Sequence, residues 1–419
     1  MSGEPGDRGE GPPLEALVSL LRRTHLAPPD LIPDAVDAAI AHLDARGVVF
    51  LADYSDTVLV PMARDPRAEP ETLAVDATLA GRAYRLLTVQ TSLGDGVPTV
   101  WVPIIDGVER LGVLQVTVGD AGRLDDEGLL NDLWSFAHFL GHLVSVLDAY
   151  GDAIDSVRRQ TARTLSAELI WQLLPPLTSG TAKVVVSGRL EPSSEVGGDV
   201  FDYALSADRA QFAVFDATGH DLHSGLAAAT ALAAYRNSRR QGHGLFEQTE
   251  AVHRAVGDEF AGRMYATGIL GDLDLDTGRL RYIVAGHPSP LLLRRGRVVK
   301  TLDSGRRPLL GLDMKAANVA EEWLEPDDVL VLYTDGITEA RDSDHQFFGV
   351  DRLVDFVERE AADGVPLPEI VRRVGRRILE HQNGVLQDDA TILLVQWTSS
   401  GQEALEPVPE QGPAQPRTG

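Results

Sequence analysis

The sequence contains no cysteine, and this absence removes several kinds of chemistry. Without thiols the chain forms no disulfide, no thiolate zinc or iron–sulfur site and no cysteine nucleophile. Long apolar runs are missing too, because the longest nearly apolar stretch, Leu226–Tyr235, is far shorter than the roughly 20 residues that span a bilayer. The N-terminus has neither the basic nor the apolar segment of a secretory signal. We therefore expect a cytoplasmic protein without a membrane partner.

Positive charge is also scarce. The chain has 38 lysines and arginines against 63 aspartates and glutamates, which gives a formal net charge of −25. Such a protein repels the phosphates of nucleic acids and of anionic lipids, so we expect no nucleic-acid partner. The acidic excess has two interpretations: it keeps the protein soluble, or part of it is gathered around metal ions. Composition alone does not choose between them.

The chain is longer than one ordinary hydrophobic core supports, so two folded units are expected. Residues 1–12 and 399–419 are together rich in Gly, Pro, Glu and Gln and are predicted to be disordered ends. Residues 13–147 combine helical and strand patterns, which favours one antiparallel sheet with helices packed on it. We expect a connecting helix over 148–176 and a second folded unit over 177–398.

The predicted connecting helix carries an apolar stripe. The chain has no proline from Asp125 to Leu174. Along this segment the following residues recur at a rough spacing of three to four: Leu140, Val144, Leu147, Ile154, Val157 and Thr161. The stripe has two interpretations, because it suits the seam of a coiled-coil homodimer and also a helix that folds back on its own domain.

The second unit has more strand patterns than helical ones. Apolar β-type runs such as QFAVFD, RLRYIVAG and DVLVLYTD alternate with hairpin signals such as DLDTGRL. This pattern predicts packed antiparallel sheets flanked by helices, so the fold class is α+β.

Several of these strands end or begin at aspartates. The residues concerned are Asp199, Asp216, Asp335 and the pair Asp388-Asp389. Each alone is explained as a turn or cap residue, which is a common use of aspartate. If the strand ends meet, however, at least four carboxylates share one small volume, where they repel each other and raise each other's pKa values. Divalent cations remove that penalty, and oxygen ligands select Mg²⁺ or Mn²⁺.

Six segments occur in an order that resembles the PPM (PP2C-like) phosphatases, specifically the bacterial SpoIIE/RsbU-type branch. They are EVGGDVFDY, VFDATGHD, MYATGILGDLDLDTGRLRYIVAGHPSPLLL, DVLVLYTDGITEAR, FFG and DDATILLV. Ala167–Leu177 resembles the segment that precedes this domain, so the resemblance covers about residues 165–397. It implies an α-β-β-α sandwich of two antiparallel sheets and a metal-dependent protein serine/threonine phosphatase.

The resemblance also implies a role for each aspartate. Asp216 corresponds to the residue that bridges two divalent cations, Mn²⁺ or Mg²⁺, with the Ala217 carbonyl beside it. The other implied metal ligands are Asp199, Asp335 and Asp388. Asp389 is expected as a ligand or directly behind the ligands, and Asp202 behind them. The implied reaction is direct hydrolysis by a water activated between the cations, without a covalent intermediate.

The chain departs from the family pattern at Asp221, where a glycine is common. An extra carboxylate there alters metal affinity or hydrogen-bonds a helix N-terminus. We interpret the neighbouring His223 as a surface residue, His287 as a structural histidine, and His220 as a weak candidate for a general acid. No arginine lies in an obvious phosphate-clamp motif, so substrate positioning is open.

The N-terminal unit resembles a GAF domain through LAVDATLAGRAYR and TVWVPIIDGVERLGVLQVT, with PAS as the second choice. No cysteine is present to attach a bilin, and His25 and His42 are insufficient grounds for haem. A sensor with an unidentified ligand and a domain that serves only dimer contacts are both consistent with the pattern.

The resemblance suggests a phosphorylated protein as the substrate, by analogy a STAS-type anti-sigma-factor antagonist. Two alternatives stay open. One is a pseudophosphatase that signals as a scaffold through the GAF-like unit, although all four metal aspartates are present. The other is a metal-dependent hydrolase of a small phosphorylated molecule.

Overall fold

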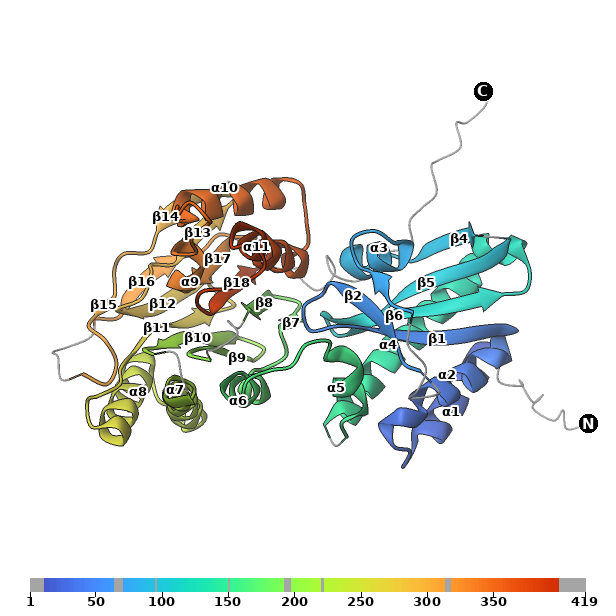
Figure 1. The fold of residues 1–419 in the computed structure, drawn as a ribbon, viewed down its shortest axis with the longest axis horizontal. Helices are drawn as coiled ribbons and strands as arrows, with labels where there is room; N and C mark the ends of the chain where they lie inside the picture. Colours follow the sequence, from blue (N-terminus) through green and yellow to red (C-terminus); the bar gives the residue numbers. More distant parts are fainter. Residues whose placement is uncertain are drawn as a thin grey trace, which may run out of the picture. The chain divides into compact units, whose positions relative to one another are not determined.

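The computed structural model describes most of the chain as two compact units. The described residues are 11–63, 71–94, 96–149, 151–191, 197–219, 222–312 and 318–398. They divide between Thr161 and Ala162 (Figure 1). The predicted disordered ends fall almost entirely outside these ranges. Across these ranges, no helix combines the length and the apolar character that crossing a membrane requires.

The N-terminal unit is built on one six-stranded antiparallel sheet in the order β3-β2-β1-β6-β5-β4. Its strands are β1 (Ala45–Ala52), β2 (Val58–Pro61), β3 (Leu73–Ala74), β4 (Gln90–Gly94), β5 (Val97–Asp106) and β6 (Glu109–Val118). β5 and β6 form a hairpin whose turn places Gly107 at φ 59°, a conformation that glycine adopts without a steric penalty.

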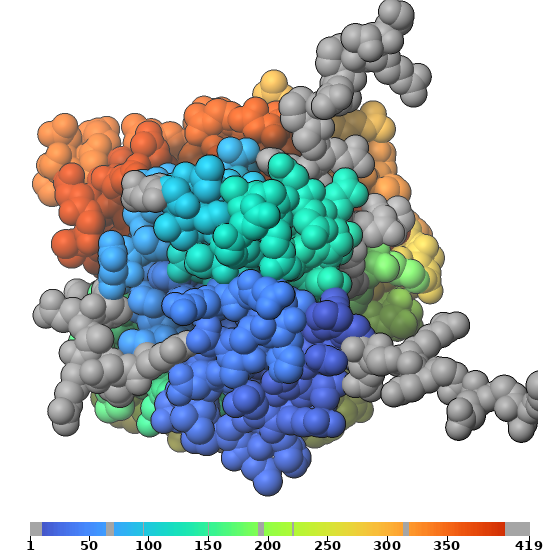
Figure 2. Space-filling model, turned by 90° about the vertical axis from the view of Figure 1, so that its right-hand side faces the viewer, coloured from blue at the N-terminus to red at the C-terminus, as the bar shows by residue number. Residues whose placement is uncertain are grey.

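Helices cover both faces of this sheet. They are α1 (Pro12–Thr24), α2 (Ile32–Ile40), α3 (Leu79–Leu86), α4 (Glu127–Asp148) and α5 (Ala153–Arg158), with 3₁₀ turns at Pro29–Leu31, Ala41–Leu43 and Ala121–Asp125. Because strand side chains alternate, Val49 and Leu51 of β1 pack in the core under α1, α2 and α4. Phe50 and Ala52 pack on the opposite face under α3. Figure 2 shows the blue segment with α1 and α2 below the cyan and teal segment with β4 and β5.

The prediction of one continuous connecting helix is wrong. α4 ends at Asp148, α5 is a separate short helix, and α6 (Leu165–Leu173) follows after another break. The predicted stripe from Leu140 to Ile154 is buried in the core of the N-terminal unit, so the helix folds back on its own domain. Arg158 of α5 also donates to the Ala52 carbonyl, at 3.1 Å. The stripe is therefore not available as the seam of a homodimer.

The second unit contains two six-stranded sheets. The first, here called the β10 sheet, comprises β9 (Asp199–Leu205), β10 (Arg209–Ala217), β11 (Ala266–Asp274), β12 (Arg279–Ala285), β15 (Arg306–Arg307) and β16 (Ala320–Trp323). The second, the β18 sheet, comprises β7 (Thr178–Thr181), β8 (Val184–Glu191), β13 (Leu291–Arg294), β14 (Arg297–Thr301), β17 (Val329–Tyr333) and β18 (Ala390–Trp397). All strand pairs are antiparallel except β12 with β15.

The two sheets pack face to face between two helical layers (Figure 1). A Cβ atom added at Gly188 of β8 would lie 2.6 Å from the ring of Phe201 of β9, so this glycine makes room for a ring of the opposite sheet. α7 (Leu222–Arg240) and α8 (Leu245–Phe260) pack on the β10 sheet, and α10 (Gly349–Ala362) and α11 (Leu367–His381) on the β18 sheet. This arrangement confirms the predicted α+β fold class and α-β-β-α sandwich.

α6 belongs to this second unit, which therefore begins earlier than the expected boundary at residue 177. Ile170 of α6 is buried in the core of the sandwich. Ser166, also buried, lies so close to Gly225 of α7 that any side chain at Gly225 would collide with its hydroxyl oxygen. The close packing of these two small residues explains why α6 stays with α7.

Candidate active site

The predicted aspartates lie at one end of the sandwich. Asp199 begins β9, and Asp216 is its direct partner on β10, so both side chains occupy the inner face of the β10 sheet. Asp335 follows β17 as the first residue of the short helix α9 (Asp335–Thr338). Asp388 and Asp389 precede β18, which is paired with β17 so that the end of one strand adjoins the start of the other.

Hydrogen bonds join the two sheets at this end. The Asp389 carboxylate accepts the backbone N–H of Gly198, at 2.7 Å, and that of Asp199, at 3.4 Å. The Thr334 hydroxyl donates to Oδ2 of Asp199, at 2.8 Å, and its oxygen accepts the backbone N–H of Thr391, at 3.0 Å. Asp199 and Asp389 are only 2% and 3% exposed. The relative position of the sheets is thus fixed where the aspartates lie.

Two glycines permit this close approach. A Cβ atom at Gly198 would lie 2.7 Å from the carbonyl oxygen of Ala217 on β10. A Cβ atom at Gly336 would collide with the carbonyl oxygen of Asp389. Any larger residue at either position would push an aspartate-bearing segment away from its neighbour in the same sheet, β9 from β10 or the end of β17 from the start of β18. The glycines beside the aspartates therefore allow the aspartate-bearing segments to pack closely against each other.

The aspartates interact through their charges. Burial, followed by the carboxylates of Asp335, Asp388 and Asp389, raises the pKa of Asp216 to about 7. Burial, followed by Asp216 and Asp389, raises the pKa of Asp199 well above its ordinary value. The largest influences on both groups are thus burial and like charge, so ionising the cluster costs free energy.

The donor set fits hard divalent cations in its chemistry. Over the parts of the chain that the structure describes, no three histidine or acidic side chains converge on one point closely enough to hold a metal ion. The gathered donors are nevertheless all oxygens, which suit Mg²⁺ or Mn²⁺. A cation among them would offset the repulsion that raises the pKa of Asp216. Asp388 is exposed, and Asp216 and Asp335 are partly exposed, so the cluster is open to solvent.

Asp202 does not join this cluster. It lies three residues after Asp199 on the same strand, so its side chain points to the opposite face of the β10 sheet. There it accepts hydrogen bonds from Arg236, at 2.6 Å, and from Arg239, at 2.7 Å. Its expected place behind the metal ligands is wrong, and its contacts attach α7 to β9.

The predicted histidines fall in different places. His220 and the unusual Asp221 lie outside the described residues. His223 is exposed on α7. His287 is 2% exposed, and its Nδ1 lies 2.6 Å from the hydroxyl of Thr267. No role at the cluster had been predicted for Thr267.

Threonines were the functional residues that sequence reasoning missed. Thr334 contacts Asp199, and Thr267 is the direct partner of Asp216 across β10 and β11. Thr334 also immediately precedes Asp335, so its position beside an aspartate was visible in the sequence. For Thr267 the sequence carried no local signal, because its proximity to Asp216 depends on strand register.

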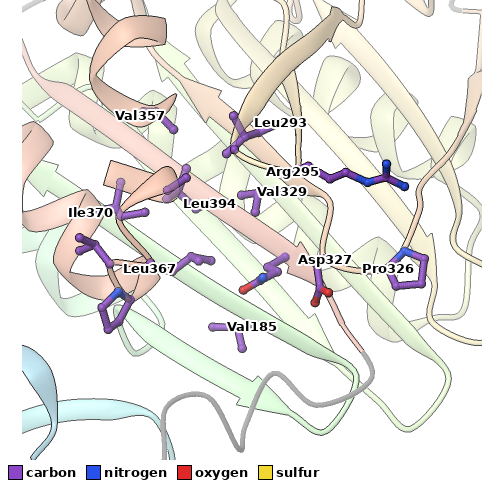
Figure 3. Close-up of a pocket in the computed structure, with 16 residues that line it drawn as sticks. Val185, Leu293, Arg295, Pro326, Asp327, Val329, Val357, Leu367, Ile370 and Leu394 are labelled. Carbon is purple, nitrogen blue, oxygen red and sulfur yellow. The ribbon is translucent and has the colours of Figure 1, made fainter. Parts of the chain in front are cut away.

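A separate cavity of about 500 Å³ lies at the other end of the β18 sheet. Leu293, Val329 and Leu394 face it from the strands, and Val357, Leu367 and Ile370 from α10 and α11 (Figure 3). Its lining comes from the start of β17 and the end of β18, whereas the aspartates flank the opposite ends of these strands. The cavity is therefore not part of the candidate active site.

Comparison with known proteins gives a family match within the second unit. Residues 206–398 match the model of the family described as stage II sporulation protein E (SpoIIE). Protein IcfG of Synechocystis sp. is 24% identical over 316 residues, which cover 67% of this chain and 48% of that protein. Phosphoserine phosphatase RsbP of Bacillus subtilis is 26% identical over 188 residues, 43% of this chain and 45% of that protein. The chain thus spans about half the length of these curated relatives.

Among solved structures, the SiaA-PP2C domain of Pseudomonas aeruginosa is 25% identical, with a TM-score of 0.46, and the match covers 51% of this chain and 85% of that domain. The family match leaves the N-terminal unit outside, so the GAF-like resemblance of that unit stays a prediction. It includes Asp216, Asp335 and Asp388, whereas Asp199 lies just before the matched residues. Residues 206–398 of the second unit are thus similar to the SpoIIE family, whose model they match.

Proposed function

We propose that the second unit is a metal-dependent protein phosphatase that acts on phosphoserine or phosphothreonine. The observation that carries this proposal is the group of aspartates, two of them fully buried, that hydrogen bonds hold at one end of the sandwich. Buried like charges without a function are costly, and selection usually removes them. The similarity to a relative named phosphoserine phosphatase supports the same reaction.

The aspartates would hold two divalent cations, Mn²⁺ or Mg²⁺. The proposed ligands are Asp199, Asp216, Asp335, Asp388 and the Ala217 carbonyl, with Asp389 close behind them. When bound, such cations supply an activated water and offset the charge of the phosphoryl group. Asp216 is the residue best placed to contact both, because it interacts with the carboxylates flanking β17 and β18 and with Asp199 of its own sheet.

The chain's own residues keep these ligands in place. The Thr334 hydroxyl donates to Oδ2 of Asp199, so the other carboxylate oxygen, Oδ1, is available to contact a cation. Asp389 holds the backbone before Asp199 through two N–H groups. In the proposed reaction a water oxygen bonds to phosphorus, the bond to the seryl or threonyl oxygen breaks, and that oxygen leaves with a proton. No cysteine is available for a covalent intermediate.

The physiological substrate in this proposal is a phosphorylated STAS-type antagonist protein, with the N-terminal unit as the regulatory domain. Both parts rest on analogy with the SpoIIE/RsbU-type branch, and a homodimer through a surface other than the α4 stripe stays part of the proposal. The scaffold alternative requires a site that has lost its ligands, whereas all four proposed ligand aspartates are present in the sequence. The small-molecule alternative is separated by substrate profiling.

The test is Mn²⁺-dependent hydrolysis of p-nitrophenyl phosphate and of a phosphoserine peptide. We compare the wild type with Asp216→Ala and Asp335→Asn, and use Asp258→Asn, an exposed position on α8, as the control. The proposal expects activity that needs metal, disappears in both site variants and persists in the control. An inactive wild type, also as a fragment beginning at Ala162, would instead favour the scaffold.

A further inference from the structure

Thr267 and His287 form a connected pair beside Asp216. Thr267 is opposite Asp216 in the register of β10 and β11, so their side chains share the inner face of the sheet. The Thr267 hydroxyl lies close enough to the Asp216 carboxylate to lower its pKa slightly, against the larger raising effect of burial. On its other side it lies 2.6 Å from Nδ1 of His287. The three groups therefore run in a line from a buried ring to the proposed bridging ligand.

The backbone brings His287 to this position. β12 ends at Ala285, which pairs with Gly268, and the next residue, Gly286, has φ 62°. This left-handed turn, which suits glycine, redirects the chain directly after the strand. His287 is then carried back over β11 to Thr267. The position of the imidazole is thus set by strand register and one turn.

The protons in this line can be assigned. His287 is buried and its pKa is lowered to about 3, so the ring is neutral and carries one N–H. The Thr267 hydroxyl has one proton, and toward an ionised Asp216 carboxylate, which only accepts, it acts as the donor. Its oxygen must then accept the proton of His287, which places the ring N–H on Nδ1.

The contacts of the other ring nitrogen are weaker. Nε2 of His287 has no hydrogen-bond partner among the described residues, and the backbone of Tyr333, as an acceptor, raises the ring's pKa slightly against the larger effect of burial. A buried acceptor without a donor is tolerated more often than a buried N–H without an acceptor. The contact with Thr267 therefore predicts the tautomer with the proton on Nδ1.

Asp199 shows the same arrangement with different parts. Thr334 donates to its carboxylate, and the oxygen of Thr334 accepts the backbone N–H of Thr391. Asp199 and Asp216, the two aspartates of the β10 sheet that belong to the cluster, thus each lie beside a threonine hydroxyl with a further polar contact. This repetition within one site favours a common role for both threonines, which is to orient a carboxylate.

We propose that His287, acting through Thr267, is a positioning residue that fixes the orientation of the Asp216 carboxylate toward divalent cations. The inference rests on the proposed function, because it concerns the affinity for those cations. The pair occupies one lone-pair direction of Asp216 and leaves the others available. Groups that orient a metal ligand in this way typically change metal affinity by about 10- to 100-fold when they are lost.

The test measures Mn²⁺ binding by isothermal titration calorimetry on the full chain, so it does not depend on catalysis. Thr267→Val and His287→Leu remove the hydrogen bonds with little change in volume. Thr267→Ser keeps the hydroxyl, and His287→Asn keeps a donor near the position of Nδ1. We expect the first two to raise the dissociation constant about 10- to 100-fold, and the two conservative variants to stay within about threefold of the wild type.

A second measurement covers the tautomer. Nitrogen-15 NMR, with the His287 signal assigned by its loss in His287→Asn, should show the proton on Nδ1. A proton on Nε2, or Mn²⁺ binding in Thr267→Val equal to that of the wild type, overturns the inference. Reduced urea stability without a change in Mn²⁺ affinity overturns it too, because it shows a structural role only. A wild type that binds no Mn²⁺ overturns the proposed function and this inference with it.

Discussion

At the scale of single residues, the neighbouring aspartates Asp388 and Asp389 differ in their burial and in the groups that they contact. Asp389 is buried and accepts backbone N–H groups of the loop before β9. Asp388, the residue before it, is exposed and contributes to the repulsion felt by Asp216. Both carboxylates therefore add charge to the cluster, but Asp389 holds the loop before β9, whereas Asp388 accepts the backbone N–H of Asp389 beside it. Their proximity in sequence hides this difference.

Asp389→Ala and Asp388→Ala should separate the two duties. The first leaves buried N–H groups without an acceptor, so we expect it to lower the free energy of unfolding by about 1–3 kcal/mol. The second removes a repulsive charge together with one exposed acceptor for the Asp389 N–H, so in the absence of metal the two effects should offset and leave the stability close to that of the wild type. Urea unfolding in EDTA measures both. Equal losses in the two variants would contradict the assignment.

Asp216→Asn should stabilise the metal-free protein in a pH-dependent manner. Because the folded-state pKa of Asp216 is raised to about 7, its ionisation costs stability, and the cost grows as the pH rises from about 4 to 7. We expect the variant to exceed the wild type by about 1–2 kcal/mol at pH 7.5, and by much less near pH 4.5. Urea unfolding in EDTA at both pH values is the measurement. A gap that is larger at pH 4.5 would refute the sign.

At the scale of elements, the position of α7 depends on one buried carboxylate. Asp202 of β9 binds Arg236 and Arg239, and Arg236 also donates to the carbonyl of Leu173 at the end of α6. Arg239 in turn stacks over the ring of Tyr235. A strand and two helices are thus joined around a single side chain, on the face of the sheet that looks away from the active site.

Asp202→Asn should therefore affect stability and not metal binding. The change leaves two arginines without a charged partner in a largely buried place, and such losses cost about 3 kcal/mol. The Mn²⁺ dissociation constant should stay within about threefold of the wild type. Urea unfolding and titration calorimetry measure the two quantities. Weaker Mn²⁺ binding with an unchanged free energy of unfolding would contradict this structural role and indicate that Asp202 acts at the active site.

Elements also show why parts of the structure were predictable and others were not. The aspartates could be found because an apolar run visibly ends at Asp216 and at Asp335. Which strand ends meet could not be read, because β8 and β18 pair from opposite ends of the unit's sequence. The pairing of Thr267 with Asp216 depends on that long-range register as well. Local patterns identify strands but not their partners.

The α4 stripe illustrates the same limit for helices. Its spacing correctly marked Leu140 and Val144 as buried, but a coiled-coil seam and a domain core require the same spacing. The deciding contacts lie far away in sequence, in strands of the N-terminal sheet. Asp202 was misplaced for a simpler reason: its distance of three residues from Asp199 already put it on the other face of a strand.

At the scale of the whole molecule, the boundary between the units lies before α6. A fragment of residues 162–398 should unfold cooperatively, because it keeps Ile170 in the core. A fragment of residues 178–398 loses that side chain and the contacts of α6 with α7, so we expect it to be less stable by about 2–4 kcal/mol. Urea unfolding of both fragments is the test. Equal midpoints would show that α6 adds nothing to the phosphatase unit.

The hydrogen bonds from Thr334 to Asp199 and from Gly198 to Asp389 cross from one sheet to the other. The distance between Asp216 on one sheet and Asp335 on the other therefore depends on how the two sheets are aligned. A substitution at a distant inter-sheet contact, such as Phe201 against Gly188, could slide one sheet without unfolding the domain. A shift of about 1 Å in the position of a reacting group costs roughly 100-fold in rate. Substitutions in the core between the sheets would therefore change the rate of catalysis even when every residue of the site stays the same.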